Sequence, residues 1–237
     1  MKATRASILV VAVPALTLAF LPGLVAAQQS PSDDIPVFHG RKVAGVMSYR
    51  GAPWLERADR AREENTAALL AKMNLQPGQN VADIGCGSGY FTRRMAATVG
   101  PDGYVFAVDI QPEMLEILKR NVKELGLGNV VPVLGQEGNP FLPEGEIDWI
   151  LLVDVYHELQ QPAEMLAHMH DALAPEGRVA LAEFRLDGPS AAHIKLDHRM
   201  SIEQVLAEWE PAGFELAEEV WEELPTQHLF IFKKSGS

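Results

Sequence analysis

The stretch that decides the fold is Val81-Ala82-Asp83-Ile84-Gly85-Cys86-Gly87-Ser88-Gly89-Tyr90. Its first residues are apolar and predict a short buried strand, and a helical pattern begins at its end. Three glycines at alternate positions allow a tight turn that brings main-chain N–H groups close to a ligand. The stretch therefore predicts a cofactor site at a strand–turn–helix junction. A glycine-rich turn without a ligand is the alternative that this stretch alone leaves open.

Strand and helix patterns alternate on the carboxyl side of this turn. Apolar runs predict strands, and apolar positions at helical spacing predict helices. The expected strands are 80–84, 104–108, 130–134, 148–153, 178–184, 214–220 and 228–232, and the expected helices are 54–73, 90–99, 112–125, 162–173 and 202–212. Such alternation implies right-handed crossovers and a parallel sheet. We expect a Rossmann-like α/β fold: a mostly parallel seven-stranded sheet with helices on both faces and an antiparallel edge strand, the last two strands pairing through a short connection at Pro225.

Composition limits the domain count and the partners. The 237 residues are 47% hydrophobic and carry a formal net charge of -12, which fits one globular domain. We assign 1–27 to a signal peptide, 28–53 to an irregular arm and 54–237 to one domain. Without a block of Lys and Arg, the chain has no electrostatic footprint for nucleic acid. Cys86 is the only cysteine, so no internal disulfide is possible.

The first residues are typical of a secretory signal peptide. Lys2 and Arg5 precede an apolar run over 8–25, and small residues end at Ala27. This order predicts cleavage after Ala27 and a periplasmic or secreted protein. A transmembrane anchor is the alternative, but Pro22-Gly23 interrupts the run. We therefore expect no stable membrane anchor after cleavage.

Two carboxylates distinguish the cofactor classes. Asp109 ends the second strand, about 20 residues past the glycine turn, where an acid binds ribose hydroxyls. A dehydrogenase shares this feature, but its pyrophosphate would lie beside Asp83, and the third glycine of its motif would fall at Tyr90. S-adenosylmethionine carries an ammonium and a sulfonium and no phosphate. Asp83 therefore favours S-adenosylmethionine over NAD(P).

Four segments in order, 83–89, 108–114, 148–154 and 173–178, resemble the motifs of class I S-adenosylmethionine-dependent methyltransferases. The resemblance implies contacts from this chain to each part of the cofactor. Asp83, Gly85, Gly87 and Gly89 would hold the methionine part, Asp109 the ribose and Ile110 the adenine face, with Gln136 or Glu137 at the adenine amino group. Residues 47–57 resemble a subgroup of exported methyltransferase-like proteins. This resemblance does not identify the acceptor.

The acceptor side is expected at the carboxyl ends of the central strands. Asp154 follows the fourth strand and is expected near the cofactor. Methyl transfer requires alignment with an in-line donor, plus a base where the acceptor carries a proton. His157 is the candidate base, with Tyr156 and Glu158 beside it as further catalytic candidates; the alternative is that these three residues only begin a loop.

Other polar residues are weaker candidates. Glu183 and Arg185 follow the next strand and either line the pocket or form a surface ion pair, and an irregular insertion with His193, Lys195, His198 and Met200 could cover the acceptor site. His168 and His170 do not face each other on a helix, so we expect no metal site.

We predict an S-adenosylmethionine-dependent methyltransferase that acts on an unidentified acceptor. A small-molecule acceptor is favoured over a protein acceptor. The alternatives are an exported protein that binds S-adenosylmethionine or a nucleoside without turnover, and an NAD(P)-dependent oxidoreductase.

Overall fold

The protein is described by a computed structural model that covers residues 36–218, 220–221 and 223–236. The predicted signal peptide and the first part of the arm lie outside the described residues. Among the helices described, none is both long and apolar enough to span a bilayer.

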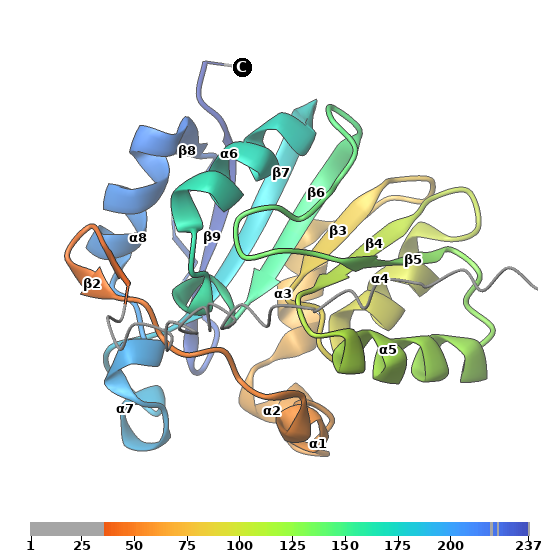
Figure 1. Ribbon diagram of the computed structural model, residues 1–237, viewed down its shortest axis with the longest axis horizontal. Coiled ribbons are helices and arrows are strands. Elements are labelled where there is room, and N and C mark those ends of the chain that lie inside the picture. The colour runs from red at the N-terminus through yellow and green to blue at the C-terminus, as the bar shows by residue number, and fades with distance from the viewer. Residues whose placement is uncertain (1–35, 219, 222, 237) are drawn as a thin grey trace, which may run out of the picture. The chain divides into compact units, whose positions relative to one another are not determined.

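The described chain is built on a seven-stranded sheet in the order β5-β4-β3-β6-β7-β9-β8 (Figure 1). Its strands are β3 (Val81–Ile84), β4 (Val105–Asp109), β5 (Val130–Leu134), β6 (Ile147–Val153), β7 (Leu173–Phe184), β8 (Phe214–Leu216) and β9 (Gln227–Lys234). The first five pair in parallel, and β9 is antiparallel to both β7 and β8. The predicted fold class is confirmed. The antiparallel strand is β9, one position in from the edge, and β8 forms the edge itself.

The strand order reverses between β3 and β6. From β3 the chain builds outward through β4 and β5, and then returns to place β6 on the other side of β3. Ligands of open α/β sheets bind at such a switch point, beyond the carboxyl ends of the strands. The topology therefore directs the search for a site to the loops that follow β3, β4 and β6.

Helices cover both faces of the sheet. One face packs against α3 (Thr66–Met73), α4 (Tyr90–Val99) and α5 (Pro112–Glu124), and the other against α6 (Pro162–Ala172) and α8 (Ile202–Trp209). Apolar side chains at helical spacing explain this arrangement, as in α5, where Leu115, Leu118 and Val122 are buried. On the other face, Trp209 stacks on Phe232 with ring centroids 4.5 Å apart.

The single helix predicted over 54–73 is wrong. The structure has three short helices, α1 (Ala52–Leu55), α2 (Arg60–Glu63) and α3. Asn65 has φ 48, in the left-handed region, which ends α2 before α3 begins. A buried ion pair of 2.9 Å between Arg60 Nε and Glu64 Oε2 holds this break. The apolar spacing over 54–73 does correspond to helices, but the left-handed residue and the ion pair divide them into separate short segments.

The described part of the arm is not wholly irregular. β1 (Val37–Phe38) and β2 (Arg41–Lys42) form a small hairpin, and η1 (Tyr49–Gly51) precedes α1. Arg41 anchors the hairpin to α8 through bonds of 2.7 and 3.0 Å to the buried carboxylate of Glu208. Four further short elements complete the fold: η2 (Tyr156–Glu158), α7 (Ser190–His193), η3 (Leu196–His198) and η4 (Glu210–Ala212).

Candidate active site

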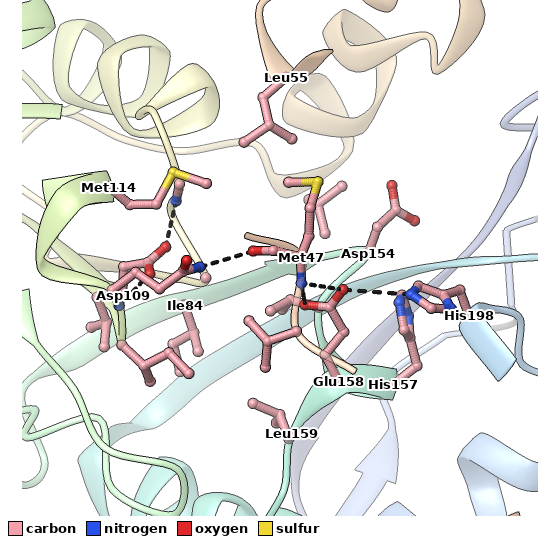
Figure 2. Close-up of a pocket in the computed structure, with 18 of the residues that line it drawn as sticks. Met47, Leu55, Ile84, Asp109, Met114, Asp154, His157, Glu158, Leu159 and His198 are labelled. Atoms are coloured by element: carbon pink, nitrogen blue, oxygen red, sulfur yellow. Dashed lines mark hydrogen bonds and ion pairs between the residues drawn. The ribbon is translucent and has the colours of Figure 1, made fainter. Parts of the chain in front are cut away.

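A cavity of about 430 Å³ lies at the carboxyl ends of β3, β4 and β6, where the switch point predicts a site (Figure 2). Its size is within the usual range for small-molecule sites. One half, which we call the cofactor half, is lined by Gly85, Gly87, Asp109, Ile110, Gln136, Glu137 and Asp154. The other, which we call the acceptor half, is lined by His157, Glu158, Leu159, Met165, Phe184, His193 and His198.

The glycine turn forms part of the cavity wall. Gly85 and Gly87 have positive φ values of 71 and 52, and both line the cavity. A Cβ atom on Gly85 would lie 2.3 Å from Val155, and one on Gly87 would lie 2.6 Å from Leu55. Only glycine fits both the conformation and the space. Gly89 does not line the cavity; it begins α4 and packs against Leu118, so its part is to position the helix.

Asp109 lies where the ribose acid was predicted. Its Oδ2 accepts a 2.9 Å hydrogen bond from the N–H of Gly87, and its Oδ1 accepts one of the same length from the N–H of Gln111. Burial raises the pKa of this carboxyl, and these backbone donors oppose the rise. Ile110 follows and is partly exposed in the cavity. The carboxylate therefore holds the turn and also faces the cofactor half.

The loop after β5 leaves the adenine assignment open. Both Gln136 and Glu137 line the cavity beside Ile110. The backbone of Gln136 pairs with Asn139, which fixes the loop. Both side chains predicted for the adenine amino group thus remain candidates.

Asp83 lies outside the cavity lining. It is buried and does not line the cavity, and its Oδ2 accepts a hydrogen bond of 2.5 Å from Thr92 Oγ1 on α4. Burial raises its pKa to about 6, against the opposing effect of Thr92. The structure therefore does not support direct contact between Asp83 and a cofactor; this side chain instead links β3 to α4, the helix that follows the glycine turn.

Asp154 lies in the cavity lining, where it was expected, and offers the carboxylate that was also expected of Asp83. It follows β6 with φ 54, and its side chain lines the cavity. Its Oδ2 accepts a 2.9 Å hydrogen bond from Gln227, whereas its Oδ1 is buried with no hydrogen-bond partner among the described residues. Burial, together with the charges of Glu64 and Glu183, raises the pKa of Asp154 well above its ordinary value. A cationic donor in the cavity would satisfy Oδ1.

The structure gives no support to a catalytic role for Tyr156. Its ring is buried against Trp209, with centroids 5.3 Å apart, and its hydroxyl donates a 2.7 Å hydrogen bond to Glu208. The side chain does not line the cavity. Tyr156 instead ties η2 to α8.

His157 lines the acceptor half, as predicted for the base. Its Nδ1 lies 2.5 Å from Oε2 of Glu183, which is buried in β7. Burial lowers the pKa of the imidazole, but the charge and hydrogen bond of Glu183 outweigh it, so the net shift is upward. This pair resembles neither of the two arrangements predicted for Glu183: the carboxylate orients the histidine from behind, and Arg185 contacts Asp187 at 3.1 Å instead.

Glu158 lies beside His157 in the same half. Both of its oxygens accept from the N–H of Met47, at 3.2 and 3.3 Å. Burial raises its pKa to about 7, against the opposing charge of His157. His198, from η3, reaches the same place: its Nε2 lies 3.8 Å from Oε1 of Glu158, and its ring centroid lies 5.1 Å from that of His157.

Comparison with known proteins agrees with this geometry. Residues 75–227 match the model of a methyltransferase domain family. This chain belongs to that family. A demethylmenaquinone methyltransferase of Geobacillus sp. is 29% identical over 145 residues, which cover 61% of this chain and 58% of the relative. An arsenite methyltransferase of Halobacterium salinarum is 27% identical over 153 residues, covering 61% and 39%. The chain thus aligns with less than two thirds of either relative.

The fold of this methyltransferase-family chain matches solved structures. A SAM-dependent methyltransferase from Aquifex aeolicus superposes with a TM-score of 0.71 at 24% identity, covering 79% of this chain and 98% of that one. The family and the fold support S-adenosylmethionine as the cofactor. The donor set fits it: a glycine turn without side chains, a carboxylate at Asp109, and an unpartnered buried oxygen on Asp154 suited to an ammonium group.

The sequence does not predict the contacts that three site residues of this methyltransferase-family chain make. The sequence makes Glu183 a candidate for the pocket lining but does not predict its pairing with His157. It places His198 only in an irregular insertion, and Met47 only in a segment that resembles other proteins. The signal that could have found Glu183 is its position as the one charged residue in the run 179–184, because a buried carboxylate needs a partner.

Proposed function

We propose that this chain is an S-adenosylmethionine-dependent methyltransferase that acts outside the cytoplasm on a small, largely apolar acceptor bearing an ionisable oxygen. The observation that carries the proposal is one continuous cavity with a cofactor half and an acceptor half, the latter containing a carboxylate-oriented histidine. The export of the chain rests on the signal-peptide pattern alone.

Each part of the cofactor has a place in this proposal. Asp109 accepts from the ribose hydroxyls with the lone pairs not used by Gly87 and Gln111, and Ile110 packs against the adenine. Asp154 accepts from the methionine ammonium through Oδ1. Bound in this way, S-adenosylmethionine supplies a methyl group already activated by its sulfonium.

The lining of the acceptor half supports an apolar acceptor. Leu159, Met165 and Phe184 line this half together with the polar groups, which suits a ring with few polar atoms. According to their names, the two relatives described above methylate demethylmenaquinone and arsenite. A soft acceptor such as arsenite prefers thiolate ligands, and the only cysteine, Cys86, is buried. The quinone-like class is therefore the better match.

His157 is the proposed base. Glu183 holds its Nδ1, which fixes the ring and stabilises the imidazolium that forms when the ring accepts a proton. His157 is buried, and Arg41 and Ala44 of the arm donate to its backbone carbonyl, so little water reaches the ring to compete for the acceptor. By removing its proton, His157 would make the acceptor oxygen a nucleophile for the methyl group that S-adenosylmethionine supplies, and the cavity would hold the two in line.

Calorimetry followed by turnover assays tests the proposal. We expect S-adenosylmethionine and S-adenosylhomocysteine to bind, and NAD not to bind. A panel of hydroquinones and phenols should then yield S-adenosylhomocysteine in a His157-dependent manner. Cofactor binding without turnover on any acceptor would favour the non-enzymatic alternative, and binding of NAD alone would refute the proposal.

A further inference from the structure

We propose that His157, Glu158 and His198 form a binding site for a divalent first-row transition-metal ion, with Zn²⁺ as the reference ion, at the acceptor end of the cavity. Sequence spacing did not predict this site, because its third member comes from the insertion after β7. The three residues are brought together by two short turns, η2 and η3.

The geometry gathers three potential ligand atoms. One ring nitrogen from each histidine and one oxygen of Glu158 lie within 4.8 Å of one another. Figure 2 shows these side chains converging at one end of the cavity. A zinc ion with bonds of about 2.0 to 2.2 Å would draw them roughly 1 Å closer. His198 can make this movement, since its side chain is 24% exposed and lies on a surface turn.

Each histidine is already oriented as in a metal site. Nδ1 of His157 pairs with Glu183 at 2.5 Å, and Nδ1 of His198 pairs with Asp197 at 2.8 Å. Histidines that bind metals usually donate their second ring N–H to a carboxylate or carbonyl, which fixes the ring. In both rings Nε2 is left for a ligand. A single catalytic base would need one such pair, and here there are two.

The contacts within the cluster are not hydrogen bonds. Nε2 of His198 lies 3.8 Å from Glu158, beyond hydrogen-bond distance. Three polar groups therefore converge on one space without satisfying one another. A cation in that space would satisfy all three.

The donor set selects the ion class. Two imidazoles and one carboxylate suit zinc, iron, cobalt or nickel, whereas magnesium and calcium prefer oxygen ligands alone. Three protein ligands leave at least one open position, as in catalytic zinc sites. Nε2 of His157 cannot bind an ion and accept a proton at the same time, because Nδ1 is paired with Glu183. If the proposed methyltransferase function also holds, the ion-bound protein would therefore activate the acceptor oxygen at the open metal position, and His157 would act as the base only in the metal-free protein. The metal site itself rests only on these side chains.

Metal binding to the whole chain from Gln28 onward, treated with a chelator and dialysed, tests the inference. Calorimetry should show one Zn²⁺ per chain, with Mg²⁺ bound at least about 100-fold more weakly. Co²⁺ should give the visible absorption bands of a low-symmetry nitrogen–oxygen site. Failure of the parent protein to bind Zn²⁺ or Co²⁺ at micromolar concentrations would overturn the inference.

Variants locate the site. His198→Ala and Glu158→Gln should each weaken Zn²⁺ binding by about 100-fold or more, and Asp197→Asn by roughly 10- to 100-fold. His193→Ala is the matched control, because His193 lies in the same insertion and lines the same cavity but is not in the cluster; its affinity should stay within about 3-fold of the parent. Circular dichroism checks that each variant is folded. If His198→Ala does not fold, Glu158→Gln still tests the site, because glutamine has the same shape as glutamate.

The outcome is separable from that of the proposed function. Binding of S-adenosylmethionine is measured on the same metal-free samples. Zinc binding that persists in both His198→Ala and Glu158→Gln would refute the metal site even where the cofactor binds. Zinc binding lost in both variants, without any cofactor binding, would support the metal site and refute the methyltransferase.

Discussion

Replacing Asp109 by Asn tests the cofactor half most directly. The carboxylate accepts hydrogen bonds of 2.9 Å from two backbone N–H groups, one on each oxygen. Each oxygen keeps a further lone pair for a ribose hydroxyl. In the Asn variant, one oxygen becomes an NH₂ group, which faces a backbone N–H and cannot accept a hydroxyl hydrogen bond.

The expected loss follows from those bonds. Each charge-assisted bond to a ribose hydroxyl contributes about 1.5 to 3 kcal/mol, and the two are not additive, so we expect a loss of about 2 to 4 kcal/mol. At about 1.4 kcal/mol for each factor of ten, the affinity for S-adenosylmethionine should fall roughly 30- to 1,000-fold. The lost bond to the turn should also lower the melting temperature.

Calorimetry with S-adenosylhomocysteine measures the affinity, and a thermal melt measures the folding. Asp148→Asn is the control: its carboxylate accepts a 2.8 Å bond from the N–H of Asn80 at the opposite end of the sheet. This variant should lose stability but keep cofactor affinity. A folded Asp109→Asn protein that binds within about 3-fold of the parent would refute the ribose assignment.

Four further outcomes are expected. His157→Ala should keep cofactor affinity within a few fold and slow turnover by about 10² to 10⁴; near-parent turnover would exclude it as the base. Asp83→Asn should flatten the pH dependence of the free energy of unfolding. In the parent, burial raises the pKa of Asp83 to about 6, so the protonated carboxyl stabilises the fold below pH ~4, and this contribution of about 3 kcal/mol is lost as pH rises through 6. Chemical denaturation from pH 4 to 7 should therefore show a steeper decline in the free energy of unfolding for the parent than for the variant. Tyr156→Phe should lower the free energy of unfolding by about 1 to 3 kcal/mol with turnover unchanged, whereas a turnover loss in fully folded protein would return Tyr156 to the site. Mass spectrometry of exported protein should find Gln28 as the first residue, and an intact leader would contradict cleavage.

Sequence periodicity was enough to predict the sheet and most helices. The strands predicted over 130–134 and 148–153 match β5 and β6 almost residue for residue. Both are continuous apolar runs between turn residues, as parallel strands usually are, although β5 lies at the sheet edge and is only partly buried. The helix over 54–73 failed for the opposite reason. Its division depends on the left-handed Asn65 and on the ion pair of Arg60, which are side-chain and backbone choices that periodicity does not record.

The sequence predicts those site residues that belong to one continuous segment. It does not predict contacts between residues that are far apart in the chain. The glycine turn and Asp109 follow from strand ends. Asp154 lies in the cavity wall, as expected from its place after a central strand. In contrast, Asp83 bonds to Thr92 on α4 and does not line the cavity, which its place in the sequence motif does not reveal. Tyr156 and His157 are neighbours that point to different surroundings, and only tertiary packing separates them.

The arm connects the two halves of the cavity. The N–H of Met47 donates to Glu158 in the acceptor half, and its C=O accepts a 2.9 Å hydrogen bond from Gln111 beside Asp109 in the cofactor half. Gln111 in turn accepts from the N–H of Tyr49 at 2.8 Å. One short run of backbone thus depends on polar groups at both ends of the cavity. The same run of backbone therefore bonds to Glu158 in the acceptor half and to Gln111 in the cofactor half.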